Sequence, residues 1–186
     1  ELQRALYENG ITNVSVLYNG IDPEPILSSS ETDLQRFKEL YGLEHTLPLF
    51  LPGRFSHAKG FYNVIETLPI LIKQEPRTVF FVAGASDEDR EKILAYARLY
   101  GVEKHVSIAS WLAPSDMELA YQASAIVLTP SLIFDSFPTV NLEAARFRKP
   151  VVTTCFGGGK EFIRNEESGY VVNPYDITNL TEKISN

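Results

Sequence analysis

"SAIVLTPSLIFDSFPTVNLEAARFRKPVVTT" (residues 124–154) has a short apolar run at each end, with a loop and an amphipathic segment between them. The runs at 124–130 and 150–154 are unbroken rather than alternating, which is typical of strands buried on both faces of a parallel sheet. The amphipathic segment carries apolar residues at helical spacing, and Pro138 suits the first turn of a helix. The order of strand, helix and strand predicts an α/β fold.

The same pattern recurs along most of the chain. Residues 88–100 predict a helix that ends at Gly101, and Ser115 with Glu118 indicates a capping box that opens another helix. Such a succession predicts a doubly wound parallel sheet with helices on both faces. Four more unbroken apolar runs predict the remaining buried strands, at 48–53, 78–84, 105–110 and 170–172.

The first 33 residues differ from the rest. Residues 1–10 have the pattern of a helix end with its cap, and residues 13–20 that of a strand before a turn. Residues 21–33 are rich in proline and serine, which indicates a linker. We therefore expect residues 1–33 to end one domain and residues 34–186 to form a second. Because the only methionine is internal, we expect the chain to be a fragment of a longer protein.

Composition and charge exclude several classes of protein. The 186 residues are 44% apolar and 22% charged, which is ordinary for a globular domain with a real core. The formal net charge of -7 argues against nucleic acid or an anionic membrane surface as the main partner. The one cysteine, Cys155, suits a reducing compartment. No apolar run approaches the roughly 18 residues of a membrane span.

Glu143 is the least expected residue of the amphipathic segment. Val140, Ala144 and Phe147 fall at i, i+4 and i+7, on the helix face that should be buried, and Glu143 lies on that same face. A carboxylate on a buried face needs a partner. Two partners stay open from the residues alone: a ligand, or an arginine or lysine inside the protein.

Two cations follow the first predicted strand, in "GRFSHAKG" (53–60). Ligands of open parallel sheets bind beyond the carboxyl ends of the strands, so polar residues here are candidates for a site. Arg54 and Lys59, with Gly53 and Gly60 beside them, suit a diphosphate, because arginine can bind two oxygens at once and lysine is a mobile charge. The alternative is that both cations are ordinary solvated surface residues.

Asp135 follows the strand at 124–130, in the loop before the helix. Helix N-termini attract anions and offer free N–H groups, and carboxylates accept hydrogen bonds from sugar hydroxyls. Asp135 is therefore a candidate for sugar binding, with a turn or cap residue as the alternative. After the strand at 150–154, Gly157, Gly158 and Gly159 would let the backbone approach a ligand or form an anion nest, although such a turn alone is a weak signal.

Other polar patterns indicate structure rather than chemistry. The acidic run at 87–89 resembles a metal-binding pattern, but Ser86 and Asp89 suit a helix N-cap pair, and acids belong in a first turn. The three histidines lack the spacing of metal ligands, and no nucleophile motif is present. We therefore expect no metal site.

Taken together, these residues resemble the C-terminal half of a family 4 glycosyltransferase, a retaining enzyme of the GT-B fold. The resemblance covers nearly the whole chain, with seven motifs in the family's order. "VLYNGIDPE" is similar to the junction between the two domains of that fold, and "LPGRFSHAKG" to its Gly-Arg…Lys-Gly motif. The other motifs are "FVAGASDE", "SWLAPSDMELAYQASAIVLTPS", "DSFPTVNLEAARFRKPVV", "GGGKEFI" and "ESGYVVNPYD".

The resemblance implies three catalytic residues. Arg54 and Lys59 would hold the diphosphate of a nucleotide sugar and stabilise it as a leaving group. Asp135 stands where the family has the first glutamate of a Glu-x7-Glu pair, and would face the donor sugar. The backbone N–H groups of Phe137 and Thr139 would face the sugar and the phosphate.

The resemblance also implies how the nucleoside is bound. Glu143 would be the second glutamate of the pair, which in the family binds the ribose hydroxyls. Ser110 and Trp111 would meet the nucleobase, with Ser110 standing where glycine is common. Gly53 completes the donor-binding set. No metal or other cofactor is expected, because fixed cations would do that work.

The implied function is retaining transfer of a sugar, of the hexosyl type, from a nucleotide-diphosphate sugar to an acceptor, in polysaccharide or glycoconjugate synthesis. The chain would supply the Rossmann-like donor-binding half. Two alternatives stay open: a nucleotide-sugar epimerase of the same fold, and a non-catalytic nucleotide- or sugar-binding module.

The resemblance also bears on partners and location. An acceptor sugar or lipid would bind through the missing N-terminal domain, so we expect this chain to bind donor without turning it over. Its last helix would be truncated. We expect no nucleic-acid partner, no transmembrane segment and a cytoplasmic location, with peripheral membrane association through the other domain as an alternative.

Overall fold

A parallel sheet of six strands forms the centre of the molecule. The structure is a computed structural model that describes residues 2–21 and 30–186. Every neighbouring pair of strands is parallel, in the order β3-β2-β1-β4-β5-β6. Six of the seven predicted strands are confirmed, as β1 (Leu47–Pro52), β2 (Thr78–Ala83), β3 (Val106–Ala109), β4 (Ile126–Thr129), β5 (Val151–Thr154) and β6 (Gly169–Val172).

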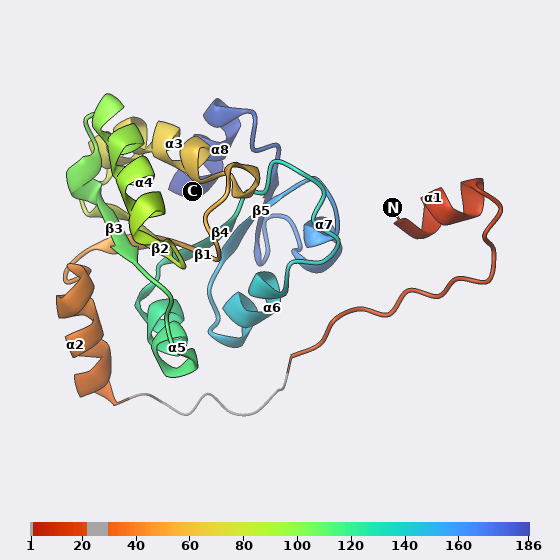
Figure 1. Ribbon diagram of the computed structural model, residues 1–186, viewed down its shortest axis with the longest axis horizontal. Helices are drawn as coiled ribbons and strands as arrows, with labels where there is room; N and C mark the ends of the chain where they lie inside the picture. The colour runs from red at the N-terminus through yellow and green to blue at the C-terminus, as the bar shows by residue number, and fades with distance from the viewer. Residues whose placement is uncertain (1, 22–29) are drawn as a thin grey trace.

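Helices cover both faces of the sheet (Figure 1). Every residue of β2 and β5 is buried, which explains why these strands are unbroken apolar or small runs. On one face lie α3 (Phe61–Gln74), α4 (Asp87–Leu99) and α8 (Ile177–Ser185), and on the other α2 (Glu31–Tyr41), α5 (Pro114–Ala123) and α6 (Thr139–Arg146). Each face has its own apolar core. The doubly wound α/β prediction is therefore confirmed.

The strand order places a topological switch point between β1 and β4. From β1 the chain winds outward through β2 to β3, and then returns to β4 and winds the other way through β5 to β6. The loops that leave β1 and β4 therefore diverge over opposite faces of the sheet, which opens a crevice between their carboxyl ends. The fold predicts a ligand site there.

The predicted strand at 13–20 is wrong. Residues 11–21 form no regular element, and the backbone carbonyl of Val14 accepts a hydrogen bond from the Gln3 side chain (3.0 Å) instead of a neighbouring strand. The preceding helix is confirmed as α1 (Leu2–Glu8), which lies apart from the layers in Figure 1. A strand pattern without a partner for its backbone groups does not make a strand.

One of the two predicted N-terminal side-chain caps is confirmed. Ser86 accepts from the Asp89 N–H and the Asp89 carboxylate accepts from the Ser86 N–H, both at 3.2 Å, which is the expected cap pair at the start of α4. The capping box at Ser115 is wrong, because α5 begins one residue earlier, at Pro114, without a side-chain cap. Proline already has the backbone angle of a first helical residue and sets the start.

The predicted linker overlaps a helix. Ser30 caps α2, so residues 31–33 form its first turn, while residues 22–29 lie outside the described part of the chain. The division between domains at residues 33 and 34 stays a prediction. Of the helices in the described ranges, none is long and apolar enough to cross a membrane.

Candidate functional site

A cavity of about 210 Å³ opens at the switch point, where β1 and β4 end. The last residues of both strands form its floor, and the loops that follow them form its walls. Four residues of the predicted site, from two loops far apart in sequence, line this cavity together: Lys59, Asp135, Phe137 and Thr139.

Lys59 reaches the cavity from a short 3₁₀ turn, η1 (His57–Lys59), after β1. Gly60 ends this turn with a φ of +79°, and a Cβ there would collide with the carbonyl oxygen of Pro130. Only glycine therefore lets the turn pack against the end of β4. Close packing at this point holds Lys59 over the crevice.

Lys59 and Asp135 form an ion pair in the cavity. Nζ of Lys59 lies 3.2 Å from Oδ2 of Asp135, and the two side chains are 45% and 20% exposed. A pair this accessible contributes about 0–1 kcal/mol to stability, so its main effect is to orient both groups. Nζ has three donors and the carboxylate has two oxygens, so both retain capacity for a ligand.

The loop that carries Asp135 rests on the glycine-rich turn. Gly158 N–H donates to the Asp135 carbonyl (2.8 Å), and Asp135 N–H donates to the Phe156 carbonyl (3.2 Å). A Cβ on Gly157 would collide with the Asp135 backbone, and one on Gly158 with that of Ser136. These two glycines make room for another loop of the protein, and their approach to a ligand stays a prediction.

The first turn of α6 faces the same cavity. Pro138 is the N-cap residue and makes no side-chain capping bond, so the helix N-terminus stays available to an anion. Beneath it the side chain of Asn141, only 1% exposed, lies with Oδ1 2.9 Å from the Thr129 hydroxyl, which is also 2.9 Å from the Thr153 hydroxyl. These contacts tie α6 to β4 and β5. These contacts were not predicted from the sequence. The signal that could have found them is Asn141, a polar residue two positions before Glu143 in the amphipathic segment.

Glu143 is half-buried and its partner is a tyrosine. The hydroxyl of Tyr121, on α5, donates to Oε2 of Glu143 at 2.6 Å. The predicted helix face is confirmed for Ala144 and Phe147, which are buried, whereas Val140 is half-buried. The internal partner is therefore neither the arginine nor the lysine considered above. Recognition of a ligand by Glu143 stays a prediction.

Tyr121 was not predicted as part of the site. Burial first, and then the charge and hydrogen bond of Glu143, raise the pKa of its hydroxyl above the ordinary value. The hydroxyl therefore stays protonated, as a donor, across the neutral range. A tyrosine on an otherwise apolar helix face was the signal that could have found it.

The other predicted residues lie outside the lining of the cavity. Arg54 is exposed on the same loop as Lys59, and Gly53, with a φ of +123°, donates to the Ala83 carbonyl at 2.9 Å. Ser110 and Trp111 follow β3 at its carboxyl end. Trp111 is 82% exposed, so it is not a core anchor.

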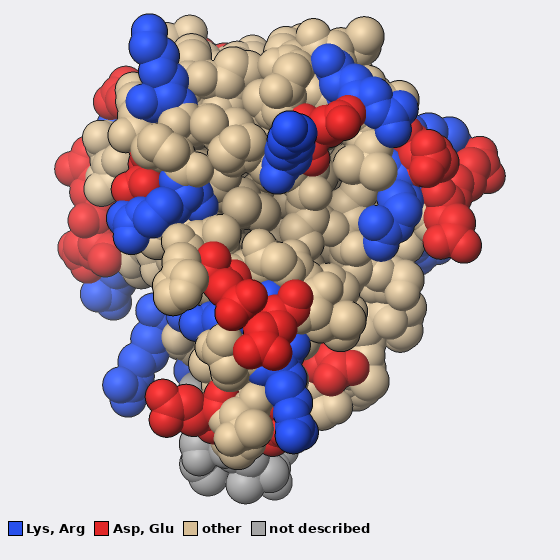
Figure 2. Space-filling model, turned by 90° about the vertical axis from the view of Figure 1, so that its left-hand side faces the viewer, with Lys and Arg blue, Asp and Glu red and all other residues tan. Residues whose placement is uncertain are grey.

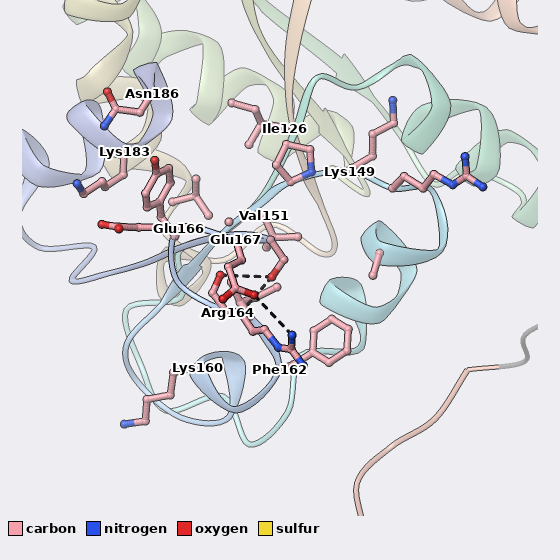
Figure 3. A pocket seen from close by; sticks show the side chains of 18 of the residues that line it. Ile126, Lys149, Val151, Lys160, Phe162, Arg164, Glu166, Glu167, Lys183 and Asn186 are labelled. Carbon is pink, nitrogen blue, oxygen red and sulfur yellow. Dashed lines mark hydrogen bonds and ion pairs between the residues drawn. The ribbon is translucent and has the colours of Figure 1, made fainter.

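A larger cavity lies at the other end of the strands. It measures about 1330 Å³, and its wall includes the first residues of β4, β5 and β6: Ile126, Val151 and Gly169. None of the predicted site residues lines it, and Arg164 pairs with Glu167 across 3.5 Å in its wall (Figure 3). Ligands of parallel sheets bind at the carboxyl ends, so we place the site at the smaller cavity.

Surface charge is mixed on the face formed by β3, α4 and α2. Acidic and basic side chains alternate there without an extended area of one sign (Figure 2). Lys92 pairs with Glu88 at 2.7 Å, and Arg98 with Glu103 at 2.8 Å. This face therefore lacks the basic footprint of a nucleic-acid binder.

Comparisons with known proteins point to one family. Residues 35–186 match the family model described as glycosyl transferases group 1. A putative glycosyltransferase of Bacillus subtilis is 24% identical over 170 residues, which cover 87% of this chain and 42% of that protein. A glycogen synthase of Mycobacterium tuberculosis is 28% identical over 182 residues, which cover 96% of this chain and 41% of that protein. The chain thus spans less than half the length of these relatives.

Solved structures share the fold. A protein of Anabaena, whose crystal structure is described as a complex with UDP and glucose, superposes with a TM-score of 0.85. The two chains are 23% identical, and the match covers 98% of this chain and 50% of that one. At this level of identity the likeness concerns the fold.

Proposed function

The chain belongs to the glycosyl transferases group 1 family, and we propose that it supplies the donor-binding half of a family 4 transferase that retains the configuration of the sugar. Its sheet and helices have the fold of one half of a GT-B enzyme. The observation that supports the proposal most is the cavity at the switch point, where Lys59 and Asp135 meet at the N-terminus of α6.

The cavity suits the diphosphate and sugar of a donor. Its 210 Å³ is below the roughly 300–1,000 Å³ of a site for a whole small molecule, so the nucleoside has to lie outside it. Lys59, Arg54 and the first turn of α6 would neutralise the charge that develops on the leaving diphosphate. These fixed charges take the role of a metal ion, and we propose that transfer needs none. The UDP bound by the Anabaena protein supports a nucleotide donor.

Asp135 would hold the donor sugar. Lys59 contacts Oδ2, which leaves Oδ1 as an acceptor for a sugar hydroxyl. Among the described residues that line the cavity, Lys59 and Asp135 are the only ionisable ones, and they are paired with each other. This arrangement favours transfer over epimerisation, which needs additional acid and base groups.

The 186-residue chain alone should bind a nucleotide sugar and form no product. Holding two substrates in a reactive geometry accounts for roughly 7–11 kcal/mol of a bimolecular barrier, and we assign the acceptor to the other half of the enzyme. The test mixes the chain with nucleotide sugars and candidate acceptors, measuring binding by calorimetry and products by chromatography. Product at the rate of the whole enzyme would contradict the proposal. Formation of an epimerised nucleotide sugar would establish the epimerase alternative. If the whole enzyme binds the nucleotide sugar and forms no product, the non-catalytic alternative holds.

Glu143→Gln should weaken ribonucleotide binding about tenfold or more, because a hydrogen bond to a charged group contributes roughly 1.5–3 kcal/mol. The amide keeps the volume and can still accept from Tyr121, so the melting temperature should change little. Glu66→Gln is the matched control, since Glu66 accepts from the Tyr96 hydroxyl (2.5 Å) away from the cavity. The measurement compares affinities for a nucleoside diphosphate and its 2′-deoxy analogue. A collapsed melting temperature with intact ribose discrimination would show a purely structural role.

Trp111 should report nucleotide binding by fluorescence. It is the only tryptophan, it is 82% exposed, and we place the nucleobase beside it. Stacking of a base on the indole should quench or shift its emission. Titration with inorganic diphosphate, which lacks a base, serves as the control. Unchanged emission at a nucleotide concentration that calorimetry shows to be saturating would place the base elsewhere.

A further inference from the structure

Tyr121 is held rigidly in the core beneath α6. Its side chain is only 2% exposed. The Phe147 ring lies parallel to it with a centroid separation of 5.3 Å and an interplanar angle of 8°, and the Phe50 ring meets it edge-on, also at 5.3 Å. Two flanking rings fix the direction of the phenol, so the position of its hydroxyl is set by packing against β1 and the end of α6.

The hydroxyl of this fixed ring meets a flexible side chain. Its 2.6 Å bond to Oε2 of Glu143 is short, as expected for a phenol that donates to a carboxylate. A glutamate has three side-chain torsions, and a half-buried one would otherwise sample several orientations. One oxygen of Glu143 is thus held by the protein, while Oε1 accepts a hydrogen bond from none of the residues that the structure describes.

The position of the bond connects the core to the candidate site. Thr139 lines the cavity, and Glu143 lies one turn beyond it on the same helix, α6. Tyr121 itself is only 2% exposed, so a ligand at the surface reaches it only through another residue, and its hydrogen-bond partner is Glu143. Any effect of Tyr121 on binding would therefore pass through Glu143.

We propose that Tyr121 is a positioning residue for nucleotide recognition: it fixes the carboxylate of Glu143 so that the free oxygen is presented to the ribose hydroxyls. The inference rests on the proposed function, in which Glu143 binds ribose. It assigns part of the selectivity for ribose to a buried residue that does not touch the ligand. A carboxylate fixed before binding loses less entropy when the nucleotide arrives.

Tyr121→Phe tests this proposal, because it removes the hydroxyl and keeps the stacked ring. We expect about a three- to tenfold loss of affinity for the nucleoside diphosphate, the range for one hydrogen bond. The preference over the 2′-deoxy analogue should shrink in parallel. Affinity for inorganic diphosphate should not change, because Lys59 and Arg54 are intact.

Tyr96→Phe is the matched control. Tyr96 also donates to a glutamate, Glu66, at 2.5 Å, but on α4 and away from the cavity. Both variants lose a tyrosine–glutamate bond, so a general loss of stability would affect both melting temperatures. Only Tyr121→Phe should change ribose discrimination.

A double variant separates positioning from an independent contribution. If Tyr121 acts through Glu143, Tyr121→Phe combined with Glu143→Gln should bind no more weakly than Glu143→Gln alone, because coupled residues are not additive. Fully additive losses would overturn the proposal. So would unchanged ribose discrimination in Tyr121→Phe while Glu143→Gln loses it, an outcome that leaves the proposed function intact.

A different pair of outcomes would point at the proposed function itself. If Glu143→Gln keeps full ribose discrimination, the role of Glu143 fails and the positioning role with it. If the wild-type chain binds no nucleotide at all, the donor-binding proposal fails first.

Discussion

Replacing Lys59 by alanine is expected to weaken the binding of a nucleoside diphosphate about ten- to a hundredfold while leaving the affinity for the nucleoside unchanged. The reason is the position of Nζ, in the cavity and 3.2 Å from Asp135, where a diphosphate would meet it. One charge-assisted contact contributes roughly 1.5–3 kcal/mol. The measurement is calorimetric titration of both ligands with both proteins.

Lys92→Ala is the matched control for Lys59→Ala. The Lys92 side chain is 51% exposed and pairs with Glu88 on α4, so the substitution also breaks one accessible ion pair. Each variant should lose at most about 1 kcal/mol of stability, and only Lys59→Ala should lose diphosphate affinity. If Lys59→Ala retains the full advantage of the diphosphate over the nucleoside, Lys59 is a surface cation.

Arg54→Ala extends the same test to the second proposed cation. Arg54 is exposed and outside the lining of the cavity, so its side chain has to turn toward a bound diphosphate. We expect a loss in the same direction and smaller than that of Lys59→Ala, because ordering a free arginine side chain costs entropy. A full diphosphate advantage in Arg54→Ala would remove this residue from the clamp.

Gly157→Ala should produce a large loss of stability, about 3 kcal/mol or more. The φ of Gly157 is +107°, and a Cβ would lie 2.8 Å from both the N and C atoms of Asp135 while colliding with its carbonyl oxygen. Relief of this clash requires the loop that carries Asp135 to move. We therefore expect a fall in melting temperature of about 10 °C together with a loss of nucleotide affinity.

Gly42→Ala separates the two causes of this destabilisation. Gly42 has a φ of +63° at the end of α2, and a Cβ there would meet nothing within 4 Å. The Gly42→Ala variant should therefore lose only the stability that corresponds to backbone strain, about 1–2 kcal/mol, and its nucleotide binding should not change. Equal shifts in melting temperature for both variants would show that the contact between the two loops contributes nothing.

The sheet could be predicted from sequence because its signals are local. Strands covered on both faces consist mostly of apolar or small residues, and the six runs show this pattern without knowledge of their neighbours. The segment at 13–20 has a similar composition but finds no strand to pair with. Pairing is a property of distant parts of the chain, which local composition does not contain.

Part of the site followed from topology. Lys59 and Asp135 are 76 residues apart, yet both follow strands at the carboxyl edge of a parallel sheet, so their meeting could be expected. The bond from Tyr121 to Glu143 could not be expected, because it depends on packing between α5 and α6. The same limit applies to Gly157 and Gly158. Their conformational freedom could be predicted from sequence, but the close contact of another loop with their backbone could not.

Binding of a nucleotide's diphosphate in the crevice between β1 and β4 is best checked by one calorimetric experiment. The wild-type chain is titrated with UDP, GDP and ADP and with the corresponding nucleosides. Two cation contacts of roughly 1.5–3 kcal/mol each predict that at least one diphosphate binds about a hundredfold or more tightly than its nucleoside. Equal affinities for diphosphate and nucleoside in every pair, or no binding of any of the three diphosphates, would show that the crevice is not a diphosphate site.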